Sequence, residues 1–249
     1  MVKIPKSHPR YFSLMTREKV TQSMKKGLVH ETGLIAHGRG EAFDYLIGEK
    51  TIQPAEDAEK IAAAALLCAK NPVISVNGNV VALTAKECIS LAESIPAKLE
   101  INLFHKTDER VDKIVNTLKK QGAKKVYGVT ANAHISGLNS DRGFCDKEGI
   151  FSADVVLVLL EDGDRCQALR NMGKIVIAID LNPLSRTAKT ASITIVDNVI
   201  RAIPNIKKWV IKLKDEDREV LEEMVKFWDN NKILKDVSSF ISKRLNSLS

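Results

Sequence analysis

Two unbroken apolar runs constrain the fold of this chain more than any other feature. Residues 154–160 and 174–180 each begin with a charged residue and continue through aliphatic side chains, without interruption to residue 160 in the first run and to residue 179, just before Asp180, in the second. A strand that is apolar on both sides must be buried on both faces, which is typical of a parallel sheet covered by helices. The two runs therefore predict an α/β fold with a buried, mostly parallel sheet.

Helix signals alternate with these strands. Pro54 followed by acidic residues predicts an alanine-rich helix to about residue 71. Thr84 opens a capping box for a helix to about residue 94, and Thr107 caps a helix that ends at Gly122. Further strands are expected at 73–76, 99–104, 125–129 and 192–196. This alternation predicts βαβ units and a Rossmann-like sheet with helices on both faces.

We interpret residues 1–249 as a single α/β domain with three parts. Residues 1–50 form a helical N-terminal section, with a helix over 17–26 that Ser13 or Thr16 caps and Gly27 ends. Residues 51–205 form the Rossmann-like core. Residues 206–249 form a helical appendage, used for dimerisation or packing, with helices expected at 215–228 and 237–248.

The charge pattern suits an anionic small molecule as well as it suits nucleic acid. The formal net charge is +7, but the positive residues are scattered and aromatic residues make up 5% of the chain. Nucleic-acid sites combine clustered positive charge with stacking aromatic rings. We therefore expect no nucleic-acid partner; the rival hypothesis of an RNA- or DNA-binding protein predicts an affinity that falls steeply with salt.

The hydropathy and cysteine patterns indicate a cytoplasmic protein without a membrane partner. No apolar run approaches the roughly 20 residues of a membrane span, and residues 1–6 lack the apolar stretch of a signal peptide. The cysteines are far apart and form no C-x-x-C pair, which predicts small core residues rather than disulfides or a zinc site. They are Cys68, Cys88, Cys145 and Cys166.

The segment 33–45, GLIAHGRGEAFDY, combines glycines with charged side chains. Glycine lets a backbone approach a ligand closely, and the guanidinium of Arg39 suits phosphate or carboxylate. Glu41 and Asp44 follow as possible metal ligands or proton acceptors, and His37 precedes them. The alternative is a turn between two helices with a solvated arginine.

Polar residues also begin at the end of the 174–180 strand, where ligands of open parallel sheets bind. Asp180 is placed to accept hydrogen bonds from ribose hydroxyls, and Asn182 to bind a base or sugar. Phosphate is expected on the polar residues that come next, Ser185, Arg186 and Thr187. The alternative is a plain Asp/Asn-Pro turn.

Two further strand ends leave the choice between ligand binding and local capping open. Asn198, with Asp197 before it, follows the 192–196 strand and either joins the site or only caps the next helix. His105 follows the 99–104 strand and either holds an anion or lies solvated at a helix start.

Several catalytic motifs are absent from the sequence. It contains no G-x-x-x-x-G-K-[ST], and no G-x-G-x-x-G follows an expected strand, so P-loop NTP hydrolysis and nicotinamide chemistry are disfavoured. There is no G-x-S-x-G elbow and no H-E-x-x-H pair.

Residues 4–11, 33–49 and 180–187, together with Asp197 and Asn198, resemble the archaeal phosphopantothenate synthetases, also called 4-phosphopantoate–β-alanine ligases. The resemblance spans essentially the whole chain. It implies a Rossmann-like, homodimeric, ATP-dependent enzyme of coenzyme A synthesis. Such an enzyme joins 4-phosphopantoate to β-alanine and releases AMP and pyrophosphate, through an acyl-adenylate.

The resemblance also implies which residues hold the nucleotide. From the N-terminal section these are Arg17 and Arg39; from the sheet they are Asp180, Leu181, Asn182, Arg186, Thr187, Asn198 and Val199. Arg39 and His37 are the expected catalytic residues, with His37 either binding the substrate phosphate or taking the amine's proton. Mg²⁺ is expected to bridge the phosphates; no side chain is assigned to it, and Glu41 and Asp44 are only candidates.

Two other functions fit the same fold. A non-catalytic nucleotide-binding regulatory protein predicts ATP binding without turnover. A relative of phosphopantothenate–cysteine ligase predicts that cysteine, rather than β-alanine, supports pyrophosphate release.

Overall fold

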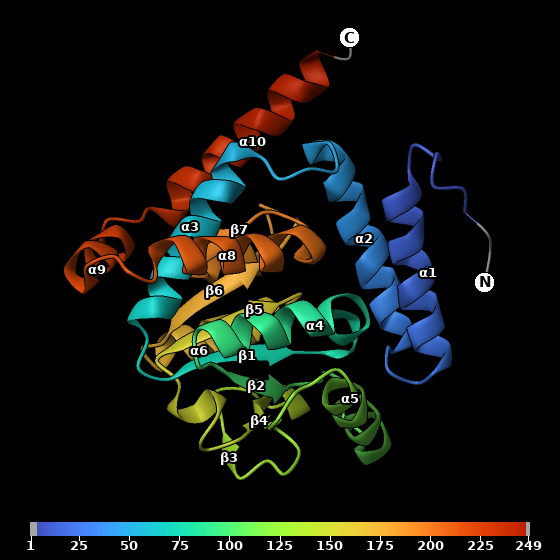
Figure 1. Cartoon of the computed structure of the whole chain (residues 1–249), viewed down its shortest axis with the longest axis vertical. Coiled ribbons are helices and arrows are strands. Elements are labelled where there is room, and N and C mark those ends of the chain that lie inside the picture. The colour runs from blue at the N-terminus through green and yellow to red at the C-terminus, as the bar shows by residue number, and fades with distance from the viewer. Residues whose placement is uncertain (1–3, 248–249) are drawn as a thin grey trace.

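The computed structural model describes residues 4–247 and is built on a five-stranded parallel sheet (Figure 1). The strand order is β2 (Lys98–Ile101), β1 (Pro72–Val76), β5 (Val155–Leu159), β6 (Ile175–Ile179) and β7 (Ile193–Ile195).

 Strand β5 spans Val155–Leu159 and lies at the centre of the sheet. The chain passes from β1 to β2 on one side and returns to β5 on the other, so the order reverses between β1 and β5. Ligands of such sheets bind beside this switch point, at the carboxyl ends of the strands.

Both faces of the sheet are buried, as the two apolar runs predict. On β5, Leu157 and Leu159 join one hydrophobic core, whereas Val156 and Val158 join a second core on the opposite face. The first face is covered by α3 (Gln53–Cys68), α4 (Gly78–Ser94), α5 (Asp108–Lys120) and α8 (Val199–Leu213). The second is covered by α6 (Gly163–Asn171) and by the segment that holds β3 (Ala133–His134), η1 (Asp141–Gly143), β4 (Phe144–Cys145) and η2 (Ile150–Ser152).

The N-terminal section is helical, as expected, and Figure 1 shows its two helices side by side. Helix α1 (Tyr11–Lys25) begins earlier than the predicted 17–26 and has no side-chain cap, so the expected capping by Ser13 or Thr16 is wrong. Gly27 does end it, with a φ of +75°. The glycine-rich segment 33–45 is not a turn: it lies inside α2 (Glu31–Ile47), which His30 caps.

Two further expectations differ from the structure. Helix α4 begins at Gly78, where the Asn77 side chain accepts a hydrogen bond from the backbone N–H of Val80. The predicted start at Thr84 instead marks a kink, with a non-helical φ of −140°. Residues 125–129 do not form a strand, because only Tyr127 pairs with β2, through an isolated bridge to Glu100.

The C-terminal helices pack onto this core. Helix α8 runs across the expected boundary at residue 205, and α9 (Arg218–Lys226) and α10 (Asn230–Asn246) follow it. Leu234 and Val237 of α10 share a small core with α2, α3 and the short α7 (Arg186–Thr190). The predicted helix end at residue 248, and residues 1–3 of the segment examined for a signal peptide, lie outside the described residues.

The cysteines and the helix lengths bear on two expectations from the sequence: core cysteines and no membrane span. All four cysteines are free, and three of them are buried. Among the helices of residues 4–247, none is long and apolar enough to cross a membrane.

Candidate active site

Helix α2 lies against the carboxyl ends of β6 and β7, and it brings residues distant in sequence to one place. Leu181, directly after β6, lies beside Gly40: a Cβ at position 40 would sit 3.4 Å from its Cδ1 atom. Arg39 is exposed on the same helix, near enough for its charge to act on Asp180. The arginine-bearing segment and the strand-end loop predicted from the sequence therefore meet.

The Asp180 carboxylate organises its own loop. One oxygen accepts a 2.9 Å hydrogen bond from the backbone N–H of Asn182, and the other accepts the hydroxyl of Ser185. Burial raises the pKa of Asp180, whereas these two hydrogen bonds and the charge of Arg39 oppose the rise. The Asp/Asn-Pro turn is thus present, and each carboxylate oxygen keeps a further lone pair for a ligand hydroxyl.

The other predicted residues of this loop differ in exposure. Arg186 is exposed and pairs with Asp164 at 2.6 Å. Thr187 is buried, and its hydroxyl donates a 3.0 Å hydrogen bond to the backbone carbonyl of Glu161. Arg186 is therefore available at the rim of the loop, while the Thr187 hydroxyl already has a protein partner.

Asn198 caps α8 and also contacts α2. Its side-chain oxygen accepts from the backbone N–H of Ile200 at 3.2 Å, and its amide donates to Asp44 at 2.8 Å. Val199, the first residue of α8, is buried. Asn198 does cap α8, and its contact with Asp44 adds a link to α2 that capping alone does not require.

A cavity of about 150 Å³ lies between α1, α2 and the start of α8. Its polar lining includes Arg10, Ser13, His37, Glu41, Asp44 and Arg201. Glu41 accepts from Arg17 Nε at 2.8 Å, from Ser13 Oγ at 2.5 Å and from Arg10 at 3.0 Å. Burial opposes ionisation of Glu41, but the hydrogen bonds from Ser13 and Arg17 outweigh it and lower its pKa. Arg17 is thus linked to the wall of this cavity through its hydrogen bond with Glu41.

His37 lines the same cavity, and one of its ring nitrogens has no hydrogen-bond partner. Its Nε2 atom is buried and has no hydrogen-bond partner. Burial lowers the pKa of His37, the charge of Glu41 opposes this, and the net shift is downward. The imidazole is therefore neutral at physiological pH and able to accept a proton.

A second cavity, of about 140 Å³, lies on the other side of α2 at the β1–β5 switch point. Its polar lining includes His30, Asn77, Asn79, His105, Arg110 and Arg142. In the sequence, only the strand-end position of His105 points to this cavity.

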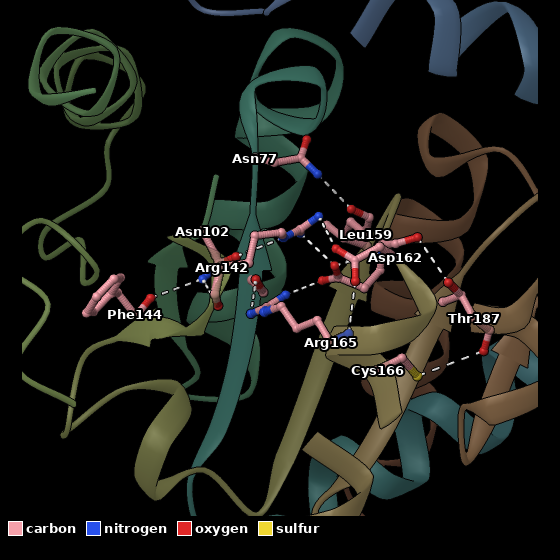
Figure 2. A network of polar contacts seen from close by, with 11 residues as sticks. Asn77, Asn102, Arg142, Phe144, Leu159, Asp162, Arg165, Cys166 and Thr187 are labelled. Atoms are coloured by element: carbon pink, nitrogen blue, oxygen red, sulfur yellow. Dashed lines mark hydrogen bonds and ion pairs between the residues drawn. The ribbon is translucent and has the colours of Figure 1, made fainter. Parts of the chain in front are cut away.

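A buried network of ion pairs lies at the carboxyl end of β5, in the middle of the sheet edge. Glu161, whose side chain is 1% exposed, pairs with Arg142 at 2.7 Å and with Arg165. Arg142 also pairs with Asp162 at 2.9 Å, and Arg165 donates to Ser75 on β1 at 3.1 Å. Figure 2 shows Arg142 and Arg165 coming together beside Leu159 and Asp162. The available sequence signal was the acidic pair directly after the 154–160 run.

The carboxylates suggested as metal ligands are engaged by the protein itself. Glu41 binds Arg10 and Arg17, and Asp44 binds Asn198 and Arg201. Within residues 4–247, no group of three histidine, cysteine, aspartate or glutamate side chains is placed to hold a metal ion. The described side chains therefore do not form a protein cage for Mg²⁺.

The chain is similar to known proteins over its full length. A profile of the family described as phosphopantothenate/pantothenate synthetase matches residues 54–244. Proteins named 4-phosphopantoate–β-alanine ligase from Thermococcus onnurineus and Thermococcus kodakarensis are each 55% identical to it over 249 residues, which is 100% of this chain and 95% of theirs. One from Methanosarcina mazei is 51% identical over 248 residues, which is 100% of this chain and 98% of that protein. The similarity therefore includes both cavities, α2 and the strand-end loops.

Proposed function

Because the chain belongs to the phosphopantothenate/pantothenate synthetase family, we propose that it is a ligase of coenzyme A synthesis that joins 4-phosphopantoate to β-alanine. A ligase of this kind needs a nucleotide co-substrate, and we propose ATP. The products are 4′-phosphopantothenate, AMP and pyrophosphate.

The chemistry requires activation of a carboxylate. A carboxylate resists attack by an amine, because its charge repels the nucleophile and oxide is a poor leaving group. In the proposed first step, an oxygen of the 4-phosphopantoate carboxylate attacks the α-phosphorus of ATP and pyrophosphate leaves. The β-alanine amine then attacks the acyl carbon of this adenylate, AMP leaves, and the amine nitrogen loses a proton to a base.

The observation that carries the nucleotide site is that α2 lies against the Asp180 loop, with Gly40 close to Leu181 and the charge of Arg39 acting on Asp180. We propose that Asp180, Leu181 and Asn182 hold the adenosine, because they follow β6 at the edge where such folds bind ligands. Positive side chains stabilise the charge that moves between phosphates. We assign that role to Arg39, with Arg17 and Arg186. Thr187 supports the Asp180 loop, and Asn198 and Val199 form the start of α8 next to the site.

His37 is the proposed base for the amine proton. Its neutral ring, its buried and unpartnered Nε2 atom and its place in the cavity beside α1 all favour this role over binding of the substrate phosphate. Mg²⁺, if used, supplies charge neutralisation on the phosphates and is held mainly by them; no side chain is assigned to it.

Isotope transfer tests the adenylate. With both carboxylate oxygens of 4-phosphopantoate labelled with ¹⁸O, the proposed route puts one label into AMP. Label in inorganic phosphate instead of AMP would overturn it. Omitting β-alanine provides the control, because the first step then stalls after at most one turnover.

We also propose that the enzyme is a cytoplasmic homodimer, which rests on the family resemblance. Light scattering is expected to give twice the 27.5 kDa chain mass. A mass of one chain at assay concentrations would contradict the dimer without touching the ligase reaction.

A further inference from the structure

We infer that the cavity at the β1–β5 switch point binds the phosphate group of the acid substrate through Arg110, His105 and His30. This inference rests on the proposed function, since it divides the sheet edge between the two phosphorylated substrates. The nucleotide is then held by the loops after β6 and β7, and the phosphorylated acid by the loops after β1 and β2.

The position of the cavity suits a second substrate. Asn77 and Gly78 follow β1, His105 lies beyond β2, and Leu160 follows β5. Strand β6, whose loop contains Asp180, is the next strand after β5. The cavity is therefore adjacent to the proposed nucleotide site along one edge, which a transfer between the two substrates requires.

Among the described residues, no carboxylate forms an ion pair with Arg110, which lines this cavity. Arg110 is half-buried and donates to the backbone carbonyls of Leu28, at 3.2 Å, and of His105. Its Nε atom is buried without a partner. No acidic residue of the described chain lines the cavity. Arg142, on the same wall, differs because Glu161 and Asp162 neutralise it. A half-buried guanidinium without a carboxylate is stabilised by an anionic ligand.

Two histidines add donors beside this arginine. The rings of His30 and His105 stack with centroids 4.0 Å apart and planes 23° apart. His30 Nδ1 accepts from the backbone N–H of Thr32 at 3.3 Å, so a neutral ring carries its proton on Nε2. Burial, with the charges of His105 and Arg110, lowers the pKa of His30, and the charge of Glu31 opposes this only in part. A bound anion relieves that repulsion between positive groups.

The walls of the cavity are held close together. Asn79 donates to the carbonyl of Gly33 at 2.8 Å and thereby ties the start of α4 to α2. A Cβ at Gly78 would collide with the carbonyl oxygen of Leu28, so only glycine permits this approach. The volume of about 140 Å³ suits a phosphate group better than a whole nucleotide, since sites for larger ligands usually exceed about 300 Å³.

Steady-state kinetics of His105→Gln and Arg110→Gln test the inference, with KM measured separately for 4-phosphopantoate, ATP and β-alanine. We expect KM for 4-phosphopantoate to rise about tenfold or more, as for loss of a charge-assisted hydrogen bond, and the other two KM values to change less than about twofold. The matched controls are His134→Gln, an exposed histidine in β3, and Arg170→Gln, an arginine that bonds Lys174 O and Ser192 Oγ.

The outcomes separate this inference from the proposed function. If the unmodified enzyme forms phosphopantothenate and His105→Gln leaves KM for 4-phosphopantoate unchanged, the cavity assignment is overturned and the function stands. A rise confined to ATP or β-alanine also overturns it. His105 is exposed, so its variant keeps the test valid if Arg110→Gln fails to fold.

Calorimetry with inorganic phosphate as the probe tests the cavity without turnover. Binding that is weakened in His105→Gln but kept in His134→Gln supports the cavity even if the unmodified protein forms no product. Equal binding by both variants contradicts it.

Discussion

Asn198 donates a 2.8 Å hydrogen bond to Asp44 and so joins the start of α8 to α2, across 154 residues of sequence. Arg201, one turn along α8, reaches the same carboxylate at 2.5 Å. Asp44 is 5% exposed. Because His37 and Arg39 lie on α2, this buried contact fixes where both stand relative to the sheet edge.

Replacing Asp44 with asparagine is expected to weaken both folding and nucleotide binding. The variant loses a buried charge partner of Arg201, which costs about 1–3 kcal/mol of unfolding free energy. KM for ATP rises because α2 is less firmly held. Urea denaturation and steady-state kinetics measure the two effects. Asp57→Asn, an exposed carboxylate of α3, is the control and should change stability by less than about 0.5 kcal/mol. Equal stability of the two variants would contradict the role of the contact.

Arg39→Ala is expected to lose ATP turnover while staying folded, because Arg39 is exposed on α2. Removing one charge-stabilising donor of a transferring group costs about 10²–10³ in kcat. Circular dichroism checks the fold and pyrophosphate release checks turnover, with Arg170→Gln as the control. Full activity would remove Arg39 from the site.

The acidic side of the pH profile tests His37. Burial lowers the pKa of His37 below its usual 6.5, so the base is neutral above that pKa and becomes protonated as the pH falls through it. We expect kcat to fall in acid with a midpoint below 6.5, and His37→Gln to lower kcat about 10²–10⁴-fold and lose this limb. Persistence of the same limb in the variant would assign it to another group.

Glu161→Gln is expected to destabilise the fold strongly, because it leaves Arg142 and Arg165 without their shared buried carboxylate. Removing one partner of a buried pair costs about 3–5 kcal/mol. Denaturant unfolding measures it. Asp164→Asn, whose pair with Arg186 is exposed, is the control, with an expected change below about 1 kcal/mol. Similar losses in both variants would show that the network is not what stabilises this end of β5.

The sheet was predictable because the sequence of each central strand alone indicates burial on both faces. Both faces are apolar in Val155–Leu159 and Ile175–Ile179, and this pattern is visible without knowing which strands lie beside them. Boundaries were less predictable where two signals compete: Thr84 opens a capping-box sequence, yet Asn77 caps α4 about two turns earlier. The glycines of α2 looked like a turn, but they lie within a continuous helix, where Gly33 lies close to Asn79 and Gly40 to Leu181.

The candidate site was only partly predictable for the same reason. Asp180 and Asn198 stand at strand ends, which sequence pattern locates. Pairs such as Arg142 with Glu161, or His30 with His105, arise only when separate loops meet in three dimensions. No spacing along the chain predicts them.

Product analysis tests the central claim most directly. Purified protein is incubated with ATP, Mg²⁺, 4-phosphopantoate and β-alanine, and the nucleotide and phosphate products are separated and counted. We predict one AMP and one pyrophosphate for each 4′-phosphopantothenate, and no sustained turnover when β-alanine is replaced by cysteine. Formation of ADP and inorganic phosphate, or ATP binding without any turnover, would contradict the account.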